Sequence, residues 1–195
     1  MNRVCWLAFA VCAILPSPTR AQNTVQPEPV VLVGGLSYGV GDTLFTPDGF
    51  VVVSAGLAGP RAVPRHERGL AKVAFVGVLV TRRVAIVFDT DFSGAGASRF
   101  SSRLMTVGAR YRVASRIWLE GGAGLGSLRY QPDSQSRALP LRQGLALSAA
   151  TGIEIVHWKL FALDLHARIS TATYGELRVT RTAIQLGYEV WLPLR

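Results

Sequence analysis

Six consecutive segments between residues 83 and 192 alternate apolar and polar side chains with a period of two. In the last of them Ile184, Leu186 and Tyr188 fall on one face, and Gln185 and Gly187 fall on the other. Because successive side chains of a pleated strand point to opposite faces, this spacing indicates β-strands that each have one apolar face. The predicted strands lie within 83–92, 105–113, 117–126, 144–155, 161–170 and 181–192.

The hydropathy of the chain leads to the same fold class by exclusion. Hydrophobic residues make up 49% of the 195 positions, charged residues only 17%, and the mean hydropathy is +0.30. After the first fifteen residues, the longest stretch without a charge is Pro29–Gly41, whereas a membrane-spanning helix needs about 20 apolar residues. Closed β-barrels are the other structures that satisfy all backbone polar groups in lipid. We therefore predict a transmembrane β-barrel.

The connections between the predicted strands alternate in length. Turns near Arg82, Ser115 and His157 are short, and longer connections rich in Gly, Ser, Pro, Asp and Arg are expected at about 93–99, 130–140 and 171–178. Short periplasmic turns and long outward loops are typical of outer-membrane barrels, which in bacteria have even numbers of strands. Counted back from the C-terminus, seven strands are predicted, and the first of them begins near residue 70. That strand is apolar on both faces, so its register stays open. An eighth strand must precede it.

Two segments are candidates for that first strand, 30–41 and 50–57. The second is slightly favoured, because it leaves a first loop of ordinary length at about 58–69. The expected organisation is then an N-terminal segment over 22–48 and an eight-stranded antiparallel barrel over 49–195. In that case residues 30–41 form an arm or an extra strand.

Residues 1–21 read as a secretory signal peptide. Arg3 is followed by the apolar run Val4–Leu15, and small residues flank Arg20 where a signal peptidase would cut after Ala21. Cys5 and Cys12 both lie in this segment, so disulfides and thiolate chemistry are excluded from the mature chain. Its 19 basic and 12 acidic residues give a net charge of +7.

The polar faces of the strands are rich in small residues, which predicts that these faces line a narrow lumen. Glycine in a strand usually marks the close approach of another group, and an eight-stranded barrel is barely wide enough for its own side chains. A soluble lipocalin-like barrel would have the reverse arrangement, with apolar residues inside. The small residues of the polar faces are Gly108, Gly122, Gly124, Gly126, Gly144, Ala146, Ala150, Gly152 and Gly187.

Charged residues of the predicted strands occupy the same alternate positions as the small residues that are predicted to line the lumen. Buried charges are tolerated when they are paired, and six acids against four arginines nearly balance. We therefore expect a structural network of ion pairs in a closed lumen, rather than an ion path. Trp118 and Trp191 fall on the same face near the short turns and are candidates to plug that mouth. The predicted network consists of Asp89, Asp91, Arg110, Arg112, Glu120, Glu154, Asp164, His166, Arg168, Arg181 and Glu189.

No catalytic, metal or cofactor site is predicted. The residue types of a hydrolase site occur close together in His166, Ser170 and Asp164. Such triads are recognised by geometry, however, and a histidine in the lumen cannot reach lipid. Residues 122–126 have the wrong spacing for a nucleotide-binding loop. Aromatic rings at both membrane interfaces are expected instead, at Tyr111, Tyr188 and Trp158 near the short turns, and at Tyr130 and Tyr174 near the long loops.

The last strand carries Gln185, Gly187, Val190 and Leu192 at the spacing of the terminal β-signal by which the outer-membrane assembly machinery recognises barrel precursors, although the chain ends in Pro-Leu-Arg and not in an aromatic residue. With the glycine-rich stretches 49–57 and 121–126 and the strand Ile184–Leu192, the chain resembles the small outer-membrane protein β-barrel domain family. The resemblance implies an architecture and the assembly machinery as a partner in biogenesis. It implies no activity, because members of that family have many roles.

Arginines crowd the predicted outward loops. Arg129, Arg137 and Arg142 are hypothesised to bind lipopolysaccharide phosphates, since guanidinium groups bind phosphate bidentately; a solvated basic rim is the alternative. Export excludes nucleic acid as a partner. The expected protein is a monomer in the bacterial outer membrane with a structural or surface-interaction role. Two alternatives stay open: a lipid-modifying enzyme similar to lipid A deacylases, and a soluble periplasmic binding barrel.

Overall fold

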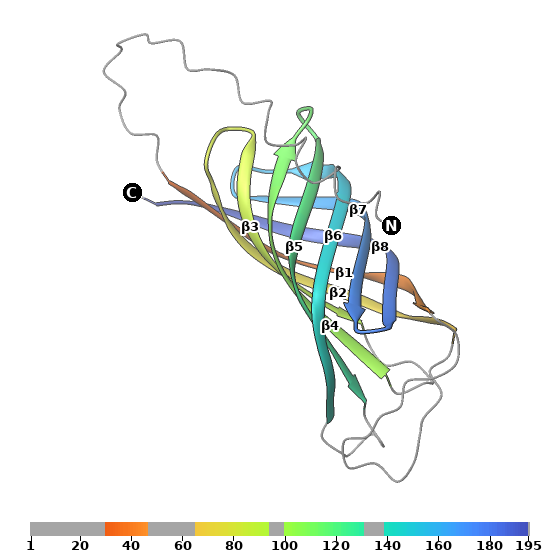
Figure 1. Ribbon diagram of the computed structural model, residues 1–195. Helices are drawn as coiled ribbons and strands as arrows, with labels where there is room; N and C mark the ends of the chain where they lie inside the picture. The colour runs from red at the N-terminus through yellow and green to blue at the C-terminus, as the bar shows by residue number, and fades with distance from the viewer. Residues whose placement is uncertain (1–29, 47–64, 94–99, 131–138, 195) are drawn as a thin grey trace.

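The structure is a computed structural model that describes residues 30–46, 65–93, 100–130 and 139–194. In these ranges the chain forms eight antiparallel strands that close into one barrel, with each strand hydrogen-bonded to its sequence neighbours and β1 paired with β8 (Figure 1). No helix among the described residues is long and apolar enough to cross a membrane. The strands are β1 Val31–Thr46, β2 His66–Leu79, β3 Val84–Ser93, β4 Phe100–Arg112, β5 Ile117–Tyr130, β6 Leu139–His157, β7 Phe161–Tyr174 and β8 Leu177–Pro193.

The first strand is not the segment favoured from sequence. β1 covers Val31–Thr46 and pairs along its length with both β2 and β8, so the preference for 50–57, and with it a barrel that starts at residue 49, was wrong. Residues 50–57 lie outside the described residues. The preference rested on the length of the first loop, and strand pairing overrides it. β1 holds four glycines. At Gly35 a Cβ would collide with the Phe75 ring, so only glycine fits there.

The two ends of the barrel differ. At one end, here called the turn end, three tight turns join β2–β3, β4–β5 and β6–β7, and β1 starts and β8 finishes there (Figure 1). Backbone hydrogen bonds close these turns, for example Val80 N–H to Val84 O at 2.8 Å and Trp158 N–H to Phe161 O at 2.8 Å. At the other end, here called the loop end, β7 and β8 are joined by only two residues, Gly175 and Glu176. Gly175 has φ of 71°, a conformation that favours glycine. The long loop expected over 171–178 is therefore a hairpin turn.

The alternation along each strand separates an apolar outer face from the lumen. In β8 Ile184 and Leu186 are 62% and 55% exposed, whereas Gln185 and Glu189 are buried. The register of β2, left open by its sequence, places Val73 in the lumen and Val76 outside. Pairing of Val73 with Asp91 and Ser37 on the neighbouring strands settles this choice, because side chains of paired residues share a face.

The lumen is filled in layers. Near the loop end, between the charged middle and the mouth, apolar side chains fill the lumen. This cluster was not predicted from the sequence. Tyr174 belongs to it and is fully buried, with its hydroxyl 3.5 Å from Ser102 Oγ, so the expectation that Tyr174 joins a lipid-facing girdle was wrong. Near the turn end Val33, Ala85 and Val87 pack with Phe75, Leu79 and Trp191. The loop-end cluster consists of Phe45, Phe100, Leu104, Leu128, Ala146, Ala172, Tyr174, Leu177 and Val179.

Candidate functional site in the barrel lumen

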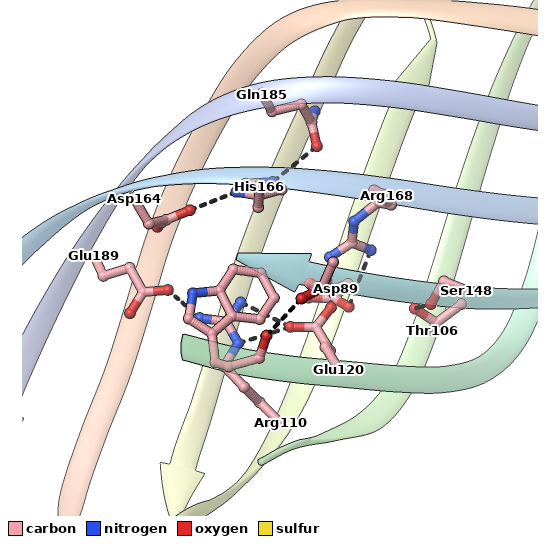
Figure 2. Close-up of polar contacts among 12 residues, drawn as sticks. Asp89, Thr106, Arg110, Glu120, Ser148, Asp164, His166, Arg168, Gln185 and Glu189 are labelled. Carbon is pink, nitrogen blue, oxygen red and sulfur yellow. Dashed lines mark hydrogen bonds and ion pairs between the residues drawn. The ribbon is translucent and has the colours of Figure 1, made fainter. Parts of the chain in front are cut away.

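Arg110 is at the centre of the charged layer. Its Nε donates a 2.8 Å hydrogen bond to Glu120 Oε2, and its Nη1 pairs with Glu189 Oε1 (Figure 2). The guanidinium carbon also lies 4.2 Å from the centre of the Phe75 ring and 4.1 Å from that of Trp118. Arg110 is thus held by two carboxylates and two aromatic faces, all in the interior, where such contacts are strongest.

A second arginine extends the network. Arg168 Nη2 lies 2.5 Å from Glu120 Oε1, and its Nη1 lies 3.4 Å from Asp89 Oδ2. Glu120 therefore accepts from Arg110 with one oxygen and from Arg168 with the other, as Figure 2 shows. Toward the loop end, Arg181 Nη1 lies 2.5 Å from Asp91 Oδ1. Arg110 and Glu120 are direct partners on neighbouring β4 and β5, whereas the other four pairs join strands that are not neighbours: β4 to β8, β7 to β5 and β3, and β8 to β3. The network ties opposite walls of the barrel together.

The remaining predicted lumen residues form two smaller groups. At the turn end, buried Glu154 pairs with Arg112 through Oε1 and lies 3.0 Å from His157 Nδ1 through Oε2. Farther in, His166 lies between Asp164 and Gln185, with Nδ1 2.5 Å from the Asp164 carboxylate and Nε2 3.0 Å from the Gln185 amide oxygen. Of the eleven residues predicted for the lumen network, ten are buried, and the Arg112 side chain is 25% exposed.

The serine of the hydrolase arrangement does not meet the histidine. Ser170 Oγ donates to Asp91 Oδ2 at 3.3 Å, and both ring nitrogens of His166 face other partners. In the described part of the chain no group of three or more His, Cys, Asp or Glu side chains is arranged to hold a metal ion. Burying six carboxylates and three guanidinium groups is compensated only when each has partners, and the contacts described above supply them.

The β-signal residues occupy different environments in β8. Gln185 points into the lumen toward His166, and Gly187 lies against Asp164, whose carboxylate would be 2.5 to 2.8 Å from a Cβ there. Leu192 is 51% exposed near the turn end. Recognition by the assembly machinery stays a prediction.

Two of the three arginines assigned to lipopolysaccharide lie at the loop end of the neighbouring strands β5 and β6. Arg129 is half-buried at the loop end of β5, and exposed Arg142 donates from Nη1 to the Tyr174 carbonyl at 3.1 Å. Arg137 lies outside the described residues.

The structure instead shows an outward-facing row of alternating aromatic and basic residues. Tyr38, Lys72, Phe92 and Arg103 are successive cross-strand partners on β1, β2, β3 and β4. Lys72 Nζ lies 5.8 Å from the Tyr38 ring centre, and the Arg103 guanidinium lies 4.9 Å from that of Phe92. Sequence reasoning missed this row because its members are distant in sequence; only the strand register brings them together.

Comparison with known proteins bears on the fold. No protein-family model and no curated protein matches the sequence. Solved structures do match. Neisserial surface protein A (NspA) is 14% identical with a TM-score of 0.56, and the match covers 84% of this chain and 99% of that one. Ail, the attachment invasion locus protein of Yersinia pestis, in complex with the heparin analogue sucrose octasulfate, is 16% identical with a TM-score of 0.52, over 83% and 99% of the two chains.

The chain has the fold of the small eight-stranded outer-membrane β-barrels. The predicted fold class and the resemblance to that group of barrels are therefore confirmed. At these sequence identities the structural similarity shows the fold alone and assigns no ligand to this barrel.

Proposed function

We propose that this protein is an exported outer-membrane barrel that is anchored in the outer leaflet by contacts with lipopolysaccharide phosphates. The observation that carries the proposal is the outer surface, where large apolar side chains are exposed on all eight strands. Soluble monomers rarely expose apolar patches larger than a few hundred Å². A soluble binding barrel would keep its apolar side chains inside, whereas here the middle of the lumen is charged.

The ends of the barrel support an orientation. Tight turns face the periplasm in outer-membrane barrels, so the turn end is periplasmic and the loop end faces outward. The proposed signal peptide, residues 1–21, lies outside the described residues and accounts for export.

The row Tyr38–Lys72–Phe92–Arg103 lies near the loop-end side of the apolar surface. On β4 the outward side chains Val107 and Met105 are apolar, and the next one toward the loop end is Arg103. On β2 the outward positions toward the loop end are Lys72, then exposed Leu70, then Arg68. Long basic side chains at such an edge keep their stems in the apolar layer and their charge at the headgroups. Guanidinium and ammonium groups bind phosphate there.

Lipopolysaccharide is proposed as the partner because its phosphates lie at this height in the outer leaflet. Lys72 and Arg103 form the centre of the contact, Arg129 and Arg142 extend it along the β5–β6 side, and Arg137, outside the described residues, is the remaining residue predicted for it. The protein acts as a monomer with a structural or surface-interaction role in this proposal, and the lumen network keeps the barrel closed and rigid.

The architecture has a direct test. Cells that express the full chain should retain it in the outer-membrane fraction, and the folded protein should migrate differently on a gel before and after boiling. Release with the periplasmic fraction, together with unchanged mobility after boiling, would reject the membrane barrel and favour the soluble one.

The lipopolysaccharide contact has a separate test. We expect the double variant Lys72→Gln/Arg103→Gln to bind lipopolysaccharide at least about tenfold more weakly than the parent in detergent micelles, because two charge-assisted phosphate contacts are lost. Binding of a dephosphorylated lipid A should be weak for both proteins. The control is Arg116→Gln/Lys159→Gln, which removes two exposed cations from the turn end and should leave affinity unchanged. Equal loss in both double variants would mean diffuse charge attraction and would contradict the assignment.

A further inference from the structure

The turn-end mouth of the lumen contains a small cavity. Its volume is about 20 Å³, and it is lined by residues from the β2–β3 turn and from β4, β5, β6 and β8. This is room for about one water molecule, so a larger ligand could insert only one small group there. Among the lining residues are four arginines, Arg82, Arg83, Arg110 and Arg112, and two tryptophans, Trp118 and Trp191.

Positive charge is in excess around the cavity. Two carboxylates line it, and each already has an arginine: Glu189 pairs with Arg110, and Glu154 pairs with Arg112. Arg83 lies in the turn with its side chain exposed, and within the described residues no ion pair engages its guanidinium. The Arg83 guanidinium is thus a cationic group at the cavity beyond those that neutralise its own acids.

Hydrogen-bond donors are in excess as well. The indole N–H groups of Trp118 and Trp191 are both shielded from solvent and have no acceptor among the described residues. Trp118 is only 2% exposed, because its ring lies beside His166, against the Arg110 guanidinium, and over Gly152, where a Cβ would collide with the ring. An indole nitrogen can only donate, and a buried donor without an acceptor costs free energy. Glu189 Oε2 also lacks a donor, so a trapped water is the competing occupant.

We propose that this mouth is a binding site for an oxyanion group, a carboxylate or a phosphate, presented from the periplasmic side. One oxygen of the group enters the cavity and accepts from the indole N–H groups, and Arg83 at the mouth supplies the countercharge. The periplasmic direction rests on the orientation given under Proposed function. The site itself does not depend on it, because the cavity exists in the folded barrel whichever way that barrel is inserted.

The test uses the full chain refolded in detergent with Trp158→Phe as background, so that the emission of Trp118 and Trp191 contributes more of the signal. The probes are acetyl-alanyl-alanine with a free carboxylate, the same peptide as its C-terminal amide, and inorganic phosphate. A saturable change in tryptophan emission is expected with the carboxylate or with phosphate, and none with the amide. Whichever oxyanion saturates the site identifies its chemistry.

Three variants separate the site from general attraction. Arg83→Gln should weaken binding of the responding probe at least tenfold, and Trp118→Phe should weaken it several-fold while leaving a ring on Arg110. Arg116→Gln removes an exposed cation of the β4–β5 turn that does not line the cavity, and should bind as the parent does. Each variant is first checked for the folded gel mobility. No saturable response to any probe would show that the cavity holds water only and would overturn the proposal. Equal response to the amide, or equal loss in Arg116→Gln, would overturn it too.

Discussion

Arg110→Met should lower the free energy of unfolding by about 3–5 kcal/mol, the range typical when one partner of a buried ion pair is removed. Methionine fills much of the same space, so the loss comes from charge. Among the described residues, Glu189 would keep no cationic partner, and Glu120 would keep only Arg168. The measurement is urea unfolding of the barrel in lipid vesicles, followed by tryptophan emission and checked by gel mobility.

Two controls test whether the loss of stability comes from a buried carboxylate left without a cationic partner. Arg112→Met should cost clearly less, because Arg112 is partly exposed and its partner Glu154 keeps His157. Adding Glu189→Gln to Arg110→Met should restore part of the lost stability, since it removes the carboxylate that was left unpaired. If Arg110→Met cost no more than Arg112→Met, the central network would not hold the walls together as described.

Leu147→Arg should cost about 2–4 kcal/mol in a bilayer, the value for a basic residue on the lipid face of a barrel near the midplane. Leu147 lies in the middle of β6, is 58% exposed, and is flanked on neighbouring strands by Ala123 and Thr171. Its charge would have to leave the apolar layer or draw water into it. The unfolding free energy in lipid vesicles measures the effect.

The matched control lies on the same strand and the same face. Gln143→Arg changes an exposed residue four positions nearer the loop end, where the cost falls to about 0–1 kcal/mol near the interface. Equal costs at positions 143 and 147 would contradict a lipid-embedded outer face. In a water-soluble barrel neither change would matter much, so this pair of variants also separates the two architectures.

The closed lumen shows how far local pattern reaches. Parity along each strand assigned eleven charged or titratable residues to the interior, and ten of them are buried, because the pleat makes side-chain direction depend on position alone. It could not say which charges meet. Arg110 reaches Glu189, 79 positions away, and Arg181 reaches Asp91, 90 positions away; such pairs depend on the barrel's closure and its register.

The first strand was predicted wrongly because loop length, on which the preference for 50–57 rested, is a weak constraint beside strand pairing. β1, Val31–Thr46, pairs with both β2 and β8 and closes the barrel. Closure satisfies the backbone groups of two edges at once, and the length of a loop carries no information about that. Tyr174 was also predicted wrongly. It lies at the end of β7, but its position in the alternation directs the side chain into the lumen, where its hydroxyl lies near Ser102.

By itself, then, the sequence determined the fold class and the side-chain direction in the six strands between residues 83 and 192, since these follow from a period of two and from the absence of any long uncharged stretch. Tertiary structure alone decided which segment is the first strand, which charges pair across the lumen, and which residues are cross-strand neighbours on the outer face. Lys72 and Arg103 lie on one outward row, and Arg83 and Trp118 line one cavity, because register and closure bring distant positions to the same height on the barrel.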